Sequence, residues 1–144
     1  MSNETIDETH PIKSFGELTE YFKGKAFFID NWTPWCSPCI QEYDYAKPLH
    51  AFLKMNNIEL VYLNSDRNLE MGKWIEYTKK YKLKGYHLKE SWDLKYDMKE
   101  KGIDTQRLPQ YLLVNSEGQV LEKNTLRPSA GSELYRQIES LLGI

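Results

Sequence analysis

The stretch WTPWCSPC at residues 32–39 contains the only two cysteines of this 144-residue chain, Cys36 and Cys39. The apolar run AFFI at residues 26–29 precedes it and a helical pattern follows it. The sequence therefore predicts a buried strand, a tight turn and a helix in that order. Cys36 then lies at the helix start, where unpaired N–H groups and the helix dipole stabilise a thiolate.

The spacing of the two cysteines favours thiol–disulfide exchange. The Cys36 thiolate is the predicted attacking group, and Cys39, one helical turn further along, is predicted to resolve the mixed disulfide. Pro38 fits the first helical turn, where its missing N–H costs nothing. The pattern is therefore typical of a redox-active pair.

Three other uses of a cysteine pair compete with redox chemistry. A zinc site needs two more ligands, and the three histidines, His10, His50 and His87, lack metal-ligand spacing. His87 is interpreted as a surface or capping residue rather than a ligand. A c-type haem site needs a histidine after the second cysteine, where Ile40 stands. A static disulfide would close a very small loop and constrain the unfolded chain little. Redox chemistry is favoured over all three, with no metal site expected.

The remaining patterns predict one α/β domain. Helices are expected at residues 15–23, 37–56, 69–82, 91–101 and 132–142, with a kink at Pro48 and with Ser14 and Ser132 as caps. Strands are expected at residues 26–31, 58–64, 111–114 and 119–123, with a short extended piece at 87–88. The first two strands are joined by a helix and should be parallel, whereas the turn at 115–118 makes the last two antiparallel.

Two carboxylates near the cysteines have more than one interpretation. Asp30 interrupts the apolar strand six residues before Cys36. It is either a strand-end carboxylate that reaches solvent or caps a turn, or a partly buried acid. Burial would raise the pKa of Asp30 and let it exchange protons with Cys39. Glu42, three residues beyond Cys39, is interpreted as an exposed helix carboxylate.

Residues 30–39, DNWTPWCSPC, resemble the active-site segment of the thioredoxin superfamily. The W-C-x-P-C form and the chain length resemble its TlpA/ResA-like branch of thiol–disulfide oxidoreductases. The resemblance runs over about residues 15–142. It implies a thioredoxin-like three-layer α/β/α sandwich with a central mixed β-sheet, formed by residues 12–144 after a flexible lead-in at residues 1–11.

The resemblance also implies roles for residues around the cysteines. Asp30 aligns with the buried aspartate of thioredoxin. Minimal thioredoxins pair that aspartate with a lysine on the neighbouring strand, and Tyr62 stands at the lysine position here. Glu42 stands where TlpA-like proteins often carry a glutamate. Pro109 matches the cis-proline that packs against the active-site disulfide. It leaves the backbone of Leu108 free to bind an extended substrate strand, and Trp35 is expected to shield one side of the cysteine pair.

These features predict a thiol–disulfide oxidoreductase that reduces protein disulfides. The alternative is a protein-binding module that uses the groove around Trp35 and Leu108–Pro109, with little redox turnover. A peroxidase is disfavoured because the peroxiredoxin pattern P-x-x-x-[ST]-x-x-C is absent. Pro34 lies only two residues before Cys36. The expected chain is a monomer without a bound cofactor, and its electrons come from another protein.

The net charge of −2 gives no argument for binding nucleic acid. No stretch approaches the roughly 18 apolar residues of a membrane span, and residues 1–11 lack the apolar segment of a signal peptide. The TlpA-like resemblance implies the periplasm or cell envelope, with a role such as cytochrome c maturation, if a leader has been removed from this sequence. The cytoplasm is the alternative.

Overall fold

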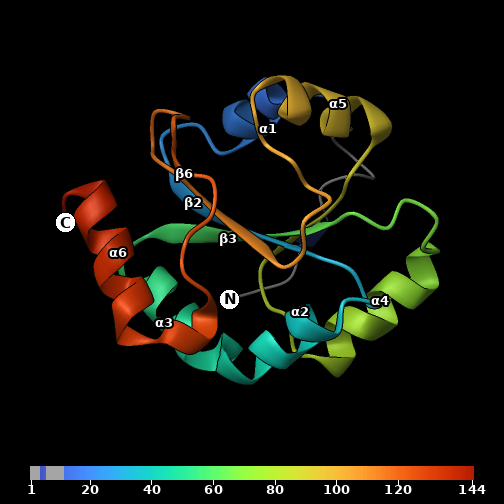
Figure 1. The fold of residues 1–144 in the computed structure, drawn as a ribbon, viewed down its shortest axis with the longest axis horizontal. Coiled ribbons are helices and arrows are strands. Elements are labelled where there is room, and N and C mark those ends of the chain that lie inside the picture. The colour runs from blue at the N-terminus through green and yellow to red at the C-terminus, as the bar shows by residue number, and fades with distance from the viewer. Residues whose placement is uncertain (1–3, 6–11) are drawn as a thin grey trace.

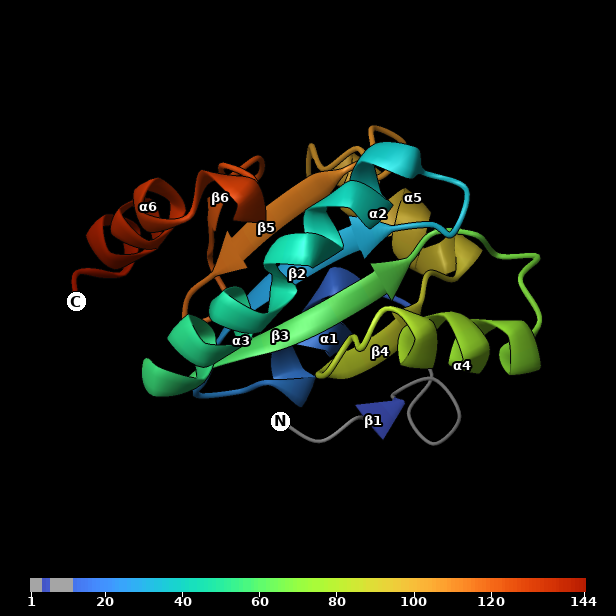
Figure 2. The same cartoon turned by 90° about the horizontal axis from the view of Figure 1, so that it is seen from below.

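A computed structural model describes residues 4–5 and 12–144 and contains a six-stranded mixed sheet with the strand order β1-β4-β3-β2-β5-β6. The strands are β1 (Glu4–Thr5), β2 (Ala26–Trp32), β3 (Ile58–Asn64), β4 (Tyr86–Lys89), β5 (Gln110–Val114) and β6 (Val120–Glu122). As Figure 2 shows, β2 lies between β3, which is parallel to it, and β5, which is antiparallel. The predicted mixed sheet is confirmed.

Helices cover both faces of this sheet, which gives the three-layer thioredoxin-like architecture (Figure 1). On one face lie α1 (Phe15–Tyr21) and α5 (Trp92–Glu100). On the other lie α2 (Ser37–Glu42), α3 (Ala46–Met55), α4 (Met71–Lys80) and α6 (Ser132–Leu142). The expected α/β/α sandwich is confirmed.

The apolar sequence of β2 follows from its central position. Phe27 and Ile29 belong to the core beneath α1 and α5, whereas Phe28 and Trp32 belong to the core beneath α3 and α6. Successive strand residues point to opposite faces. A strand that is covered on both faces therefore needs apolar side chains at both sets of positions.

The helix expected at residues 37–56 is interrupted, but not at Pro48 itself. A 3₁₀ turn at Tyr43–Tyr45 separates α2 from α3, and Pro48 is the third residue of α3. Proline has no N–H for the carbonyl of Asp44, and its ring clashes with that carbonyl. The regular helix therefore stops one turn before Pro48 and restarts with the proline in a tolerated first-turn position.

Residues 84–102 form β4 and then α5, as the sequence predicted. The Ser91 hydroxyl caps α5 by accepting a hydrogen bond from the Leu94 N–H at 3.1 Å. The Ser14 cap of α1 is also present, since its hydroxyl accepts from the Glu17 N–H. The expected Ser132 cap is wrong, because Gly131 occupies the cap position of α6 at a positive φ of 56°. That conformation favours glycine over serine.

Most of the expected lead-in at residues 1–11 lies outside the described residues. Its described part, Glu4–Thr5, adds a short parallel strand beside β4. The domain boundary at residue 12 therefore stays a prediction. Within the described ranges, no helix is both long enough and apolar enough to cross a membrane.

Candidate active site

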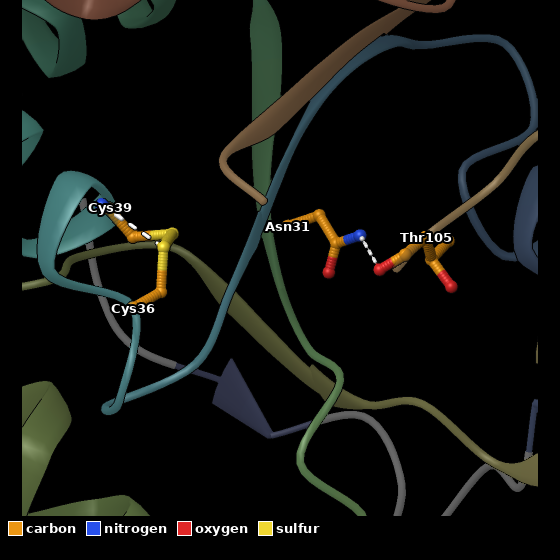
Figure 3. The surroundings of a disulfide bond; sticks show 4 residues. All are labelled: Asn31, Cys36, Cys39 and Thr105. Atoms are coloured by element: carbon orange, nitrogen blue, oxygen red, sulfur yellow. Dashed lines mark hydrogen bonds between the residues drawn. A yellow bond between two sulfur atoms is a disulfide. The ribbon is translucent and has the colours of Figure 1, made fainter. Parts of the chain in front are cut away.

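The two cysteines form a disulfide at the start of α2, with their Cα atoms 5.3 Å apart (Figure 3). Cys36 is the N-cap residue, and its sulfur accepts the Cys39 backbone N–H at 3.3 Å. Cys36 is half-buried, whereas Cys39 is fully buried. This arrangement leaves the first sulfur open to a partner molecule and protects the second, as attack by one cysteine and resolution by the other require.

Trp35 projects from the surface beside the disulfide. It is 69% exposed, and its indole Nε1 donates a hydrogen bond to Asp66 Oδ2 at 2.6 Å. The Tyr77 ring meets it edge to face, with the ring centroids 6.0 Å apart. Asp66 lies in the loop after β3, so a neighbouring strand end fixes the tryptophan. Its shielding of the cysteine pair stays a prediction.

We expect Asp66→Ala to weaken the binding of disulfide substrates. The substitution removes the hydrogen bond that holds the exposed Trp35 ring in one orientation. Loss of one hydrogen bond to a carboxylate is worth about 1 kcal/mol, which corresponds to a roughly fivefold rise in KM for a peptide disulfide. The kcat should change little. Asp66→Asn keeps an acceptor oxygen and is the matched control. An unchanged KM in Asp66→Ala would show that the Trp35 orientation does not matter.

The Leu108–Pro109 peptide bond is cis, as the resemblance implied. Gln110, the residue after Pro109, is in register with Asn31 near the C-terminal end of β2, which places the Leu108–Pro109 loop at the disulfide end of that strand. Pro109 directly precedes β5, a position where the missing N–H breaks no ladder hydrogen bond. The proposed substrate-binding segment and the cysteines therefore share one end of the molecule.

Asn31 is a residue of this region that sequence reasoning missed. Its buried side-chain amide donates to the Thr105 carbonyl at 3.0 Å and to Gln110 Oε1 at 3.1 Å. Figure 3 shows the Asn31 side chain directed toward Thr105, away from the disulfide. One amide thus holds both ends of the segment that carries Leu108–Pro109. Asn31 could have been found in the sequence as a polar residue in an otherwise apolar strand.

Asp30 is 2% exposed and lies in register with Tyr62 on β3. The interpretation as a solvent-exposed or turn-capping carboxylate is therefore wrong. Its Oδ1 atom has no hydrogen-bond partner among the described residues. Burial, with a smaller contribution from the Glu42 carboxylate, raises the pKa of Asp30 well above its usual range. A buried carboxyl with a raised pKa suits proton exchange, although this role stays a prediction.

Glu42 is also buried, so its interpretation as an exposed helix carboxylate is wrong. Its two carboxylate oxygens accept hydrogen bonds from the Ser129 backbone N–H at 2.8 Å and from the Ser129 hydroxyl at 2.9 Å. These bonds come from the turn before α6, which the sequence places 87 residues away. The packing of that turn against α2 removes Glu42 from solvent.

Three tyrosines, Tyr43, Tyr62 and Tyr111, complete the surroundings of Asp30. Burial first, and then the Asp30 carboxylate, raises the pKa of each hydroxyl. His87 stacks on the Tyr62 ring with centroids 5.3 Å apart and is buried, so its interpretation as a surface or capping residue is wrong. Burial lowers the pKa of His87 to about 4. The resemblance had singled out Tyr62, but no sequence pattern indicated that Tyr43, Tyr111 and His87 would join it.

The Redoxin family model matches residues 13–138. This chain belongs to the Redoxin family. The match includes every residue of the candidate site and nearly all of the sandwich. The resemblance of the WTPWCSPC segment to the thioredoxin superfamily is thereby confirmed, with the chain as a TlpA/ResA-like member.

Individual relatives agree with this placement of the Redoxin chain. It is 30% identical over 123 residues to the thiol-disulfide oxidoreductase ResA of Bacillus cereus, which covers 83% of this chain and 63% of that protein. The chain thus spans less than two thirds of that relative. The thioredoxin domain of a thiol-disulfide oxidoreductase from Bacteroides vulgatus is 28% identical with a TM-score of 0.65, over 85% of this chain and 83% of that one.

A more distant structure shares the fold of the Redoxin chain. StoA of Bacillus subtilis is 23% identical with a TM-score of 0.58, over 78% of this chain and 83% of that one.

In residues 4–5 and 12–144, no three His, Cys, Asp or Glu side chains are grouped as metal ligands would be.

Proposed function

We propose that this Redoxin chain is a thiol–disulfide oxidoreductase that reduces protein disulfides through Cys36 and Cys39. The observation that carries the proposal is the asymmetry of the pair. Cys36 is accessible at the start of α2, whereas Cys39 is buried behind it. The ResA relative and the Bacteroides vulgatus domain, both described as thiol-disulfide oxidoreductases, support the same chemistry.

The reaction transfers two electrons from the dithiol to the substrate. The Cys36 thiolate attacks a substrate disulfide, forms a mixed disulfide and expels the first substrate thiolate. Cys39 gives its proton to Asp30, attacks the Cys36 sulfur and expels the second thiolate. Both expelled thiolates take protons from solvent. The substrate ends as a dithiol, the Cys36–Cys39 disulfide is formed, and thiols of a donor protein then reduce it.

Substrate binding is assigned to the surface around the exposed sulfur. The backbone of Leu108 would pair with an extended substrate strand, and Trp35 would contact the substrate side chains. We propose the cell envelope as the location, with a part in cytochrome c maturation as a finer assignment. The resemblance to the TlpA/ResA-like branch supports both.

The reduction potential of the Cys36–Cys39 pair tests the proposed direction of electron transfer. Trp32 and Trp35 both lie within four residues before Cys36 in the sequence, so tryptophan fluorescence in a thiol redox buffer should follow the oxidation state of the pair. A reductase should show a value near that of thioredoxin, roughly −270 mV. A value near or above roughly −180 mV would instead indicate an oxidant or isomerase. A pair that does not cycle reversibly would favour a protein-binding module.

A further inference from the structure

The chemistry at Cys39 requires protons to cross a buried region. Cys39 is fully buried and Asp30 is 2% exposed, so neither exchanges protons directly with bulk water. In each resolving step the thiol proton of Cys39 has to leave the interior. A route of polar side chains from Asp30 to the surface would serve this need.

The structure contains such a set of side chains on three neighbouring elements. Tyr62 of β3 is paired in register with Asp30 of β2, and paired positions on adjacent strands direct their side chains to the same face. The Tyr62 hydroxyl is 2.7 Å from Nε2 of His50, which belongs to α3. His50 lines a surface pocket of about 370 Å³. We propose that Tyr62 and His50 carry protons between Asp30 and solvent.

Tyr43 lines the same pocket as His50, but neither its hydroxyl nor that of Tyr111 offers a comparable route. The hydroxyls of Tyr43 and Tyr111 are buried and have no hydrogen-bond partner among the described residues. His87 lies against the Tyr62 ring, but its Nε2 is 3.0 Å from the Leu83 carbonyl and the residue is buried. Of the three tyrosines, Tyr62 has the hydroxyl bonded to a side chain that lines a pocket.

Polar and charged groups from several elements face each end of the route. Asp30 is faced by Glu42 of α2, Tyr43 of the 3₁₀ turn, Tyr62 of β3 and Tyr111 of β5. His50 is faced by Tyr62 and shares its pocket with Tyr43, Asp44, Lys47, Tyr81, Lys82 and Lys84. Burial first, and then the Lys84 ammonium, lowers the pKa of His50 to about 4. The imidazole is therefore neutral at physiological pH. It holds the extra proton from Tyr62 only until its Nδ1 proton is released.

The proton balance is closed at each step. Asp30 takes the Cys39 proton and passes a proton to the Tyr62 hydroxyl, while Tyr62 gives its own proton to Nε2 of neutral His50. His50 then releases its Nδ1 proton to water. One proton leaves for each disulfide formed, and no extra charge stays in the interior. Reduction of the Cys36–Cys39 disulfide runs the same transfers in reverse and restores the starting tautomers.

This inference rests on the proposed oxidoreductase function, and one experiment separates the two. The reduced chain is mixed with glutathione disulfide, quenched with acid at successive times and analysed by mass spectrometry for the mixed disulfide. In His50→Ala and in Tyr62→Phe the mixed disulfide should form at the parental rate. It should then decay at least about tenfold more slowly, an effect smaller than the roughly hundredfold or more of a direct general acid or base, because both side chains act through Asp30.

Imidazole in the buffer distinguishes proton transfer from a structural role. It can enter the space vacated in His50→Ala and should restore the decay rate there, whereas Tyr62→Phe should not respond. Phe52→Ala, which removes a ring from the same helix α3, is the matched control and should decay at the parental rate with and without imidazole. Parental decay in His50→Ala, or slow decay that imidazole does not restore, would overturn the proposal. If the parent formed no mixed disulfide, the oxidoreductase function itself would fail.

Discussion

Cys36→Ser should lose all measurable reduction of insulin disulfides, because a serine hydroxyl cannot replace the thiolate as a nucleophile toward sulfur at neutral pH. Cys36 is the half-buried member of the pair and caps α2. Serine is a favoured N-cap residue, so the helix should form as before. The measurement is the rate of insulin reduction with dithiothreitol as the electron source, with circular dichroism to confirm the fold.

Cys39→Ser is the matched variant, and it should fail at a different step. Its Cys36 thiolate still attacks a substrate, but the buried resolving sulfur is gone. Stable mixed disulfides with substrate proteins should therefore accumulate and run as reducible adducts on non-reducing gels. Full insulin reduction by Cys36→Ser would show that the mechanism is wrong. Adducts on Cys36→Ser rather than on Cys39→Ser would reverse the two roles.

Asp30→Asn should make the oxidised chain more stable at neutral and alkaline pH and should slow resolution by Cys39. The gain in the free energy of unfolding should be several kcal/mol, which is the order of the penalty for one uncompensated buried charge. The loss in the resolution rate should be roughly a hundredfold, the lower end of general acid–base effects. Urea unfolding and the acid-quench assay measure the two quantities.

The pH dependence of this stability gain has a definite sign. The pKa of Asp30 is raised in the folded state, so the folded protein holds the proton more tightly than the unfolded chain does. The contribution of Asp30 to stability is fully present below its unfolded pKa of about 3.9 and is lost as the pH rises through the folded pKa. The advantage of Asp30→Asn should therefore be small in acid and grow with rising pH.

Glu59→Gln provides the matched control for Asp30→Asn. Glu59 is a partly exposed carboxylate on β3 that pairs with the Lys25 ammonium at 3.4 Å. Its replacement should change stability by well under 1 kcal/mol, as for other surface ion pairs. If parent and Asp30→Asn lost stability equally with rising pH, Asp30 would not carry a buried charge.

The predicted helices and strands agree with the structure wherever the local pattern was sufficient. The strand at 58–64 has the expected bounds, and the helix expected at 91–101 runs from Trp92 to Glu100. The exceptions have local physical causes. The helix is interrupted one turn before Pro48 rather than at it, since the proline leaves the carbonyl four residues before it without a hydrogen bond. Gly131 replaces Ser132 as the cap because the turn before α6 adopts a positive φ.

The other interpretations that failed concern burial. Glutamate is rarely buried unless it is paired, and histidine is intermediate, yet Glu42 and His87 are both buried. The turn before α6 covers Glu42, and Tyr62 and Trp74 pack around His87. Each covering group comes from a distant part of the chain. No local pattern in the sequence contains that information.

The sequence by itself determined the fold class and the redox pair. Both depend on local spacing: two cysteines three positions apart at a helix start, and strand and helix periodicities around them. Only the tertiary structure decided what surrounds Asp30. Glu42, Tyr62 and Tyr111 come from separate elements, and sheet pairing and helix packing bring them together. Burial, and the pKa shifts that follow from it, are properties of that assembly.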